Sequence, residues 1–220
     1  MLVPCITPLI EYQKKKQVPR KEVDSFLIAG IMAPPEYRIT KIATPNCLNN
    51  HAMFGTLFGK RGLIEKFDTY ECHAMDQDDE GGDTKKEQLL LFHDVVIGSN
   101  LCGHDGIVHG GITSFLFDEV VGWGHRLVMR RRQQKGKNAD DDTVDLGRDG
   151  TLPQGVSANL NIDFRVPLRV NTLVRIKTYL VRTHGRKVFL RVTLESANDQ
   201  YPPILYAEAA SIMVTLKSRL

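Results

Sequence analysis

The chain has 220 residues, of which 42% are hydrophobic and 25% are charged, and it carries a formal net charge of +3. This composition is typical of an ordinary soluble globular protein. The small charge, without a basic stripe interleaved with aromatic residues, argues against nucleic-acid binding. The four cysteines are scattered and form no C-x-x-C pair, so neither a disulfide scaffold nor a standard zinc site is expected.

The N-terminal residues predict an extension rather than a membrane anchor. The longest apolar run, 26–33, is far shorter than the roughly 20 residues that cross a bilayer, and residues 1–10 lack the basic start of a signal peptide. We expect an intracellular protein, cytoplasmic or mitochondrial, without membrane contact. Residues 1–50 are predicted as an extension with a short amphipathic helix, and residues 51–220 as the main domain.

The first half of this domain predicts strands and one long helix. Strands are expected near 60–75 and 89–97, and a helix near 110–130 that is apolar nearly all round, as in a helix buried in a core. Residues 133–153 are polar and glycine-rich, and we expect a mobile loop. The basic run 130–132, followed closely by three aspartates at 140–142, predicts a solvated segment.

The C-terminal part alternates apolar and polar residues, as strands of an antiparallel meander do. In the first of these strands, Leu160 and Phe164 are predicted on one face and Ser157 on the other. In the last strand the apolar series runs through Ala209 into Ile212 and Val214. The simplest assembly is an α+β domain, a curved antiparallel sheet wrapped around one central buried helix.

The segment 109–118, H-G-G-I-T-S-F-L-F-D, carries the most chemical information. A glycine such as Gly110 at a helix start lets a backbone N–H approach a ligand, where the helix dipole favours negative charge. Asp118 lies among apolar residues, and a carboxylate that is costly to bury is expected to have a partner or a function. Together they suggest an oxyanion donor and a base or nucleophile for attack on a carbonyl. Gly111 and Ser114 share a helix face with Asp118, which leaves room for a ligand alongside.

This motif, H-G-G-x6-D, resembles that of the hotdog-fold thioesterases, in particular the branch related to phenylacetate-pathway thioesterases. The resemblance extends over residues 89–215 and includes Gly155-Val156-Ser157, the I-D-F-R-V-P stretch at 162–167 and the hairpin at 182–186. It implies a hotdog fold and hydrolysis of an acyl-CoA thioester to free acid and CoA. No metal or redox cofactor is implied, because coenzyme A enters as part of the substrate.

The resemblance also implies roles for individual residues. Asp118 would activate water or attack the thioester carbon, the Gly110 N–H would hold the oxyanion, and Ser157 would orient the water. For His109 we favour a role in fixing the helix start over one as a general base. Relatives often carry Asn or Gln shortly before H-G-G, where this chain has Gly103 with His104 beside it. The second oxyanion donor could therefore be His104, a backbone N–H, or missing.

Two arginines, Arg165 and Arg186, are further candidates for substrate binding, because guanidinium groups bind phosphates such as those of CoA. The alternative for each is a solvated position on the sheet. For Asp118 the alternative is a structural carboxylate neutralised by Arg126.

Helix geometry adds an expectation of its own. Eight residues separate Gly110 from Asp118, which is about 12 Å along one helix axis. Both groups must reach one carbonyl within about 3 Å, which a single straight helix does not allow. We therefore expect a homodimer, or a dimer of dimers, in which each site combines Gly110 of one chain with Asp118 of the other.

Two other functions remain open at this stage. A hotdog module that binds acyl-CoA or lipid without turnover is favoured by the absence of Asn or Gln before H-G-G, and opposed by Asp118. A hydratase acting on hydroxyacyl thioesters would need a differently spaced catalytic His and Asp or Glu pair, which the sequence does not show.

Overall fold

The computed structural model describes residues 37–42, 52–59, 62–74, 87–134, 154–197 and 202–216. The predicted N-terminal helix and nearly all of the predicted loop at 133–153 lie outside these ranges. Tyr37–Ile42, which the predicted boundary at residue 50 places in the extension, forms a strand of the sheet and pairs with Ile64–Ala74. No helix in the described ranges is long and apolar enough to cross a membrane.

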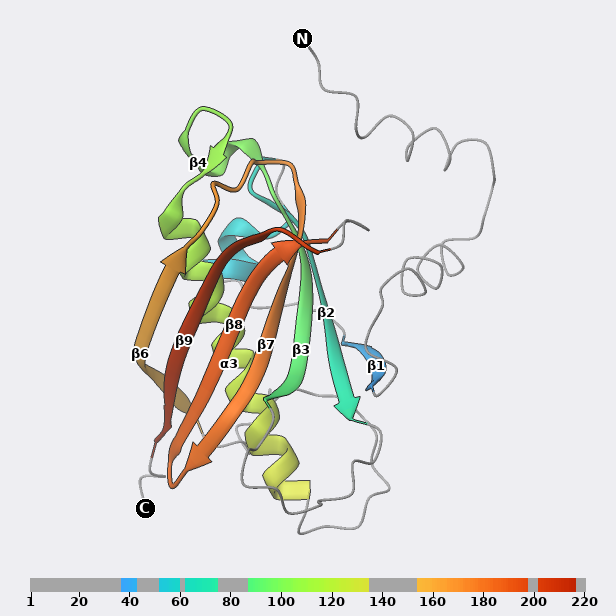
Figure 1. Ribbon diagram of the computed structural model, residues 1–220, viewed down its shortest axis with the longest axis vertical. Helices are drawn as coiled ribbons and strands as arrows, with labels where there is room; N and C mark the ends of the chain where they lie inside the picture. Colours follow the sequence, from blue (N-terminus) through green and yellow to red (C-terminus); the bar gives the residue numbers. More distant parts are fainter. Residues whose placement is uncertain are drawn as a thin grey trace, which may run out of the picture. The chain divides into compact units, whose positions relative to one another are not determined.

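The described chain forms a large antiparallel sheet and one long helix (Figure 1). The sheet has seven strands in the order β1-β2-β3-β7-β8-β9-β6, and α3 runs along one face of it. In chain order the elements are β1 (Tyr37–Ile42), η1 (Ala52–Leu57), β2 (Ile64–Ala74), β3 (Gln88–Ile97), η2 (Ser99–Leu101), β4 (Cys102–His104), β5 (Ile107–Val108), α3 (Gly110–Gln134), β6 (Gly155–Phe164), β7 (Leu173–His184), β8 (Lys187–Ser196) and β9 (Leu205–Thr215). The predicted α+β class and hotdog arrangement are confirmed.

Helix α3 is buried on one side only. Leu116, Phe117, Val120 and Leu127 are fully buried against the sheet. Gly111 and Asp118 are exposed, and Ser114 and Gly122 are partly exposed, so the stripe of small and polar residues faces away from the core. The helix predicted as apolar nearly all round is therefore buried on its apolar side, and the sheet leaves the predicted face of small and polar residues open.

Strand β6 departs from the predicted alternation at a register shift between Ser157 and Asn159. In an antiparallel ladder, residues directly opposite each other share a face. Ser157 lies opposite Met213 and Leu160 opposite Ser211, and both of these β9 residues are buried. The extra residue in β6 thus brings Ser157 and Leu160 to the same inner face, whereas the sequence alternation predicts opposite faces. A bulge has this effect because it shifts the side-chain period by one.

The last strand also differs from its predicted pattern. Ser211, Met213 and Thr215 are buried on the inner face of β9, while Ile212 and Val214 are less buried and point the other way. Two polar side chains are tolerated inside because each has a partner. Ser211 Oγ donates to the Asn159 carbonyl at 3.0 Å, and Thr215 Oγ1 lies 2.9 Å from His125 Nε2.

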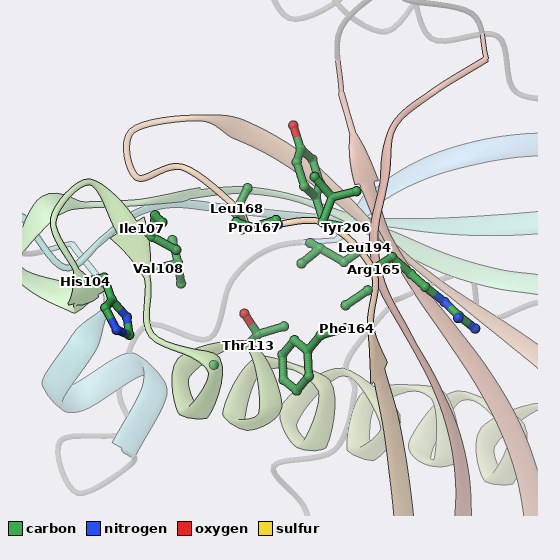
Figure 2. A pocket seen from close by; sticks show the side chains of 13 residues that line it. His104, Ile107, Val108, Thr113, Phe164, Arg165, Pro167, Leu168, Leu194 and Tyr206 are labelled. Carbon is green, nitrogen blue, oxygen red and sulfur yellow. The ribbon is translucent and has the colours of Figure 1, made fainter.

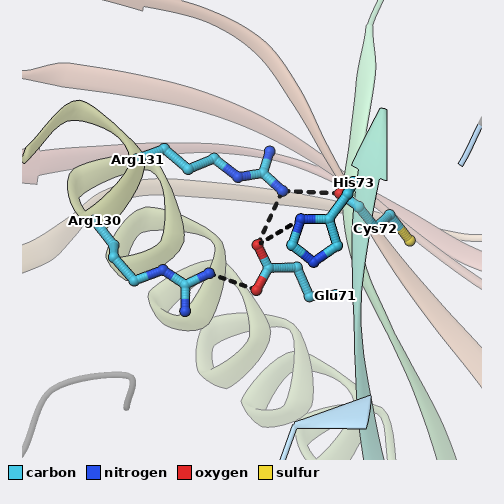
Figure 3. A network of polar contacts seen from close by, with 5 residues as sticks. All are labelled: Glu71, Cys72, His73, Arg130 and Arg131. Carbon is cyan, nitrogen blue, oxygen red and sulfur yellow. Dashed lines mark hydrogen bonds and ion pairs between the residues drawn. The ribbon is translucent and has the colours of Figure 1, made fainter. Parts of the chain in front are cut away.

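A buried carboxylate links β2 to the end of α3 (Figure 3). Glu71 is 1% exposed and accepts hydrogen bonds from Arg130 and, at 3.1 Å, from Arg131. Arg131 also donates to the Cys72 carbonyl at 2.8 Å. The prediction of a solvated basic run at 130–132 is therefore wrong for these two arginines. The helix continues past them, and one carboxylate, 59 and 60 residues earlier, pairs with both.

A second buried polar residue lies deeper in the core. His93 on β3 is fully buried between Phe67 and Trp123, and its Nδ1 lies 3.0 Å from Thr69 Oγ1. Burial disfavours the charged imidazolium and lowers the pKa of His93 from 6.5 to about 3. The ring is therefore neutral in the folded protein at physiological pH.

This burial predicts acid destabilisation. Between pH 6.5 and 3 the unfolded chain binds a proton at His93 that the folded chain does not, so the free energy of unfolding falls as the pH is lowered, by up to about 1.4 kcal/mol per pH unit. His93→Asn, which retains a partner for Thr69, should reduce the change of the free energy of unfolding with pH. The measurement is urea denaturation at several pH values between 6.5 and 4. The control is His184→Gln at an exposed position. An unchanged slope in His93→Asn would contradict the assignment.

Candidate active site

The start of α3 is shaped by the short hairpin that precedes it. β4 and β5 are joined by a turn in which Gly106 adopts a positive φ of 70°, a conformation that favours glycine. His109 follows, and its backbone N–H donates to the Leu101 carbonyl at 2.9 Å. These contacts fix the point at which the chain enters the helix.

His109 caps the first turn of α3. The Gly111 N–H donates to His109 Nδ1 at 2.9 Å, and the His109 carbonyl accepts from Ile112 at 2.9 Å and from Thr113 at 3.3 Å. The ring therefore satisfies one of the backbone donors that a helix start leaves without a partner. Within the described ranges, the Gly110 N–H has no hydrogen-bond acceptor. It is the donor that the first turn leaves available.

A cavity of about 540 Å³ opens at this helix start (Figure 2). Its walls come from the β4–β5 hairpin, the first turn of α3, residues 164–168 at the end of β6, and the facing parts of β8 and β9. Most lining side chains are apolar, including Val108, Leu168 and Leu194, whereas His104, Thr113 and Arg165 are polar. Gly110 lies in the wall, so its free N–H and the cavity belong to one site.

Asp118 lies two turns further along α3 and is paired with Ser157. Ser157 Oγ donates to Asp118 Oδ1 at 2.6 Å, and the same hydroxyl lies 3.3 Å from Met213 Sδ. The bulge in β6 makes this contact possible by turning Ser157 to the inner face. Asp118 itself is exposed, so the prediction of a buried carboxylate is wrong for the single chain. No ion pair joins Asp118 to Arg126 in the described part of the chain.

The single chain does not bring Gly110 and Asp118 together. Gly110 lines the cavity and lies near Phe164 at the end of β6, whereas Asp118 contacts Ser157 near the beginning of that strand. The two sets are separated by eight helical residues, or about 12 Å. The exposed Ser114 face lies between them, and Ser114 Oγ donates to the Gly110 carbonyl at 3.0 Å.

The predicted arginines lie at opposite ends of β9. Arg165 hydrogen-bonds Glu208 at 3.1 and 2.7 Å and lies 3.6 Å from Asp163, and its side chain is half exposed. Arg186 donates to the Thr215 carbonyl at 3.2 Å. Only Arg165 lines the cavity, together with His104. The structure therefore does not join Arg165 and Arg186 in one chain.

Three residues at the site were not predicted as functional from sequence. Thr113 lines the cavity from the buried side of the helix, Met213 contacts Ser157, and Glu208 holds Arg165. Residue spacing gave no signal for Met213 and Glu208, because their neighbours lie on or directly after a strand far away in sequence, and Thr113 occupies an unspecified position of H-G-G-x6-D. Glu119, next to Asp118 in the sequence, accepts a hydrogen bond from the Trp123 indole at 3.0 Å.

Residues 105–202 match the family model described as Thioesterase superfamily. The matched thioesterase segment contains α3, β6, β7 and β8, and with them Gly110, Asp118 and Ser157. Over 129 residues, the chain is 27% identical to an uncharacterised protein of Schizosaccharomyces pombe, covering 59% of this chain and 60% of that one. It is 24% identical over 135 residues to acyl-coenzyme A thioesterase THEM4 of Rattus norvegicus, covering 60% of this chain and 44% of that one.

The aligned segment thus spans less than two thirds of these relatives. Among solved structures, a thioesterase superfamily protein from Shewanella loihica aligns with a TM-score of 0.41 at 16% identity, covering 64% of this chain and all of that one. A Streptococcus mutans protein bound to acetyl-CoA aligns with a TM-score of 0.42 at 14% identity, covering 66% of this chain and all of that one.

The start of β6 generates a prediction about stability. A Cβ on Gly155 would overlap the His125 ring, which is buried and bonded to Thr215. Gly155→Ala should lower the free energy of unfolding by about 1–3 kcal/mol through overpacking, measured by urea denaturation. In the background of His125→Ala the same substitution should cost much less. Additive effects of the two substitutions would show that the ring and Gly155 do not constrain each other.

Proposed function

We propose that this chain is an acyl-CoA thioesterase that works as a homodimer with two shared active sites. The proposal is carried by one observation: a carboxylate held by a serine and a free helix-start N–H lie on the exposed side of the same helix. The match of residues 105–202 to the Thioesterase superfamily supports the reaction class, and the similarity to an acyl-coenzyme A thioesterase supports the substrate class.

Chemically, the oxyanion and the attacking group need separate partners. The Gly110 N–H, at the positive end of the helix dipole, would stabilise negative charge on the thioester oxygen. Ser157 donates to Asp118 Oδ1, which leaves Oδ2 free to take a proton from water. Water would then add to the thioester carbon, the C–S bond would break, and the CoA thiolate would take the proton from Asp118, which restores the carboxylate. Direct attack by Asp118, giving an anhydride that water hydrolyses, is the alternative route.

A two-fold axis would bring these separated groups together. Ser114 lies midway between Gly110 and Asp118 along α3. On β6, Phe164 lies near Gly110 and Ser157 contacts Asp118, so the midpoint of the strand is at Leu160 and Asn161. An axis through both midpoints would place Asp118 of the partner subunit opposite Gly110, and would do so twice. The strand that contacts both helix residues is thus compatible with the same centre of symmetry.

The edge of the sheet supports the same arrangement. In the described chain β6 is the last strand of the sheet, so one side of it is free to pair with another strand. Large apolar side chains at this edge are open to solvent, with Val156 46% and Phe164 57% exposed. Antiparallel pairing of two β6 strands would cover these side chains and extend the sheet from one subunit to the other.

The same symmetry would reunite the predicted phosphate-binding arginines. In one chain Arg165 lies at the cavity end of β9 and Arg186 at the other end. Because the paired subunits run in opposite directions, Arg186 of the partner subunit would lie at the end that carries Arg165 and His104. A CoA phosphate would then meet positive charge from both subunits.

The reaction itself is tested by thiol release. Purified protein should release free thiol from a panel of acyl-CoA substrates, and Asp118→Asn should lower kcat by about 10²–10⁴-fold, as expected for loss of a general base. Ser157→Ala should lower it less, since Asp118 remains. Tight acyl-CoA binding without release at any chain length would favour the non-catalytic binding module instead.

Sharing of the sites is tested by mixing inactive chains. Gly110→Pro removes the N–H at the first helical position, where proline is tolerated. Gly110→Ala, whose Cβ would make an ordinary 3.5 Å contact with Phe164, retains the N–H and is the matched control. Gly110→Pro and Asp118→Asn should each be inactive alone. Reassociated in equal amounts, they should regain about a quarter of wild-type activity, because half of the dimers would carry one intact site. No recovery in verified heterodimers would contradict shared sites.

A further inference from the structure

We propose that the Thr113 hydroxyl is the second oxyanion donor, acting beside the Gly110 N–H. This inference rests on the proposed thioesterase function. It assigns a role to a residue that the motif does not include, at the place where the sequence left the second donor open.

Thr113 presents to the cavity a hydroxyl that no described protein group uses. The residue is 4% exposed and lines the cavity, and Figure 2 shows its hydroxyl oxygen turned toward the interior. Within the part of the chain that the structure describes, this hydroxyl has no hydrogen-bond partner. The oxygen borders a mostly apolar cavity and is not taken up by another protein group there, so it is available to donate to a ligand.

The helix cap explains why this hydroxyl is available. A threonine inside a helix usually bonds the carbonyl four residues earlier, which here belongs to His109. That carbonyl already accepts the backbone N–H groups of Ile112 and Thr113, at 2.9 and 3.3 Å. Ser114 shows the contrast, because its hydroxyl donates to the Gly110 carbonyl at 3.0 Å. The His109 cap thus occupies the usual acceptor of Thr113.

Position along the helix places the two donors near one oxygen. Side chains on a helix lean toward its N-terminus, so Thr113 covers the first turn, next to Gly110. Residues three apart lie about 5–6 Å from each other on the helix surface. Gly110 has no side chain that could stand between its own N–H and the Thr113 hydroxyl. A thioester oxygen that accepts from the Gly110 N–H would therefore lie within reach of the Thr113 hydroxyl. The oxygen would receive one neutral donor from the backbone and one from a side chain.

His104 is the rival second donor. It lines the same cavity but is exposed and belongs to the hairpin that precedes the helix. Its ring is held by no hydrogen bond within the described residues, whereas Thr113 is fixed by burial in the first turn. Preorganised donors are the ones that stabilise a transition state effectively, which favours Thr113.

The test compares Thr113→Val with Thr113→Ser. Valine keeps the branched shape but removes the donor, and should lower kcat by about 100-fold for every acyl chain that the wild type hydrolyses. Serine should restore most of this loss. Binding of an S-alkyl-CoA thioether, which lacks the carbonyl, should be unchanged in both variants. The control is Thr178→Val, which removes a fully buried hydroxyl without a protein partner, against the far part of α3.

The outcomes separate this proposal from the proposed function. If the wild type releases thiol and folded Thr113→Val does so equally fast, the oxyanion role is wrong while the thioesterase stands. A loss confined to hydroxylated or keto acyl chains would overturn it in favour of substrate recognition by Thr113. A 100-fold loss in His104→Ala together with wild-type rates in Thr113→Val would assign the role to His104. Absence of thiol release by the wild type would end both proposals.

Discussion

The one-sided burial of α3 is the constraint on which the rest of the structure depends. The sheet covers the apolar side of the helix and leaves Gly111, Ser114 and Asp118 open. A carboxylate can stay on this helix only because the side that carries it is not in the core. The same exposed side offers the small residues along which a substrate or a second helix can lie. The fold thus separates stability, on one side of α3, from the proposed chemistry on the other.

Backbone hydrogen bonding at the helix start then determines which groups remain available. His109 receives one N–H on its ring and two on its carbonyl. This arrangement leaves the Gly110 N–H and the Thr113 hydroxyl without partners in the described chain, both next to the cavity. A capping residue is usually discussed for its contribution to helix stability. Here the cap also decides which donors face the ligand.

The sequence predicted much of the fold and the position of the main motif, for reasons that are visible in the residues. The apolar series of α3, β7 and β8 have clear periods, and H-G-G marks the helix start. The alternation of apolar and polar residues gave a wrong prediction at β6, where the bulge brings Ser157 to the same face as Leu160. It was also wrong at β9, where Ser211 and Thr215 are buried with hydrogen-bond partners. The charge pattern failed for Arg130 and Arg131, because the acceptor Glu71 is distant in sequence. Alternation and spacing describe local geometry, whereas these features depend on contacts between distant strands.

The pairing of Glu71 with two arginines has a consequence for how α3 responds to its surroundings. Both halves of the helix are held by apolar contacts, such as those of Leu116, Phe117 and Leu127, and hydrophobic attraction weakens on cooling. The end near Arg130 is also held by a charge pairing, so buried that dissolved salt screens it little. On cooling, this end therefore keeps its charge pairing while the apolar contacts along the whole helix weaken. The cavity opens at the opposite end of α3, where Gly110 lies.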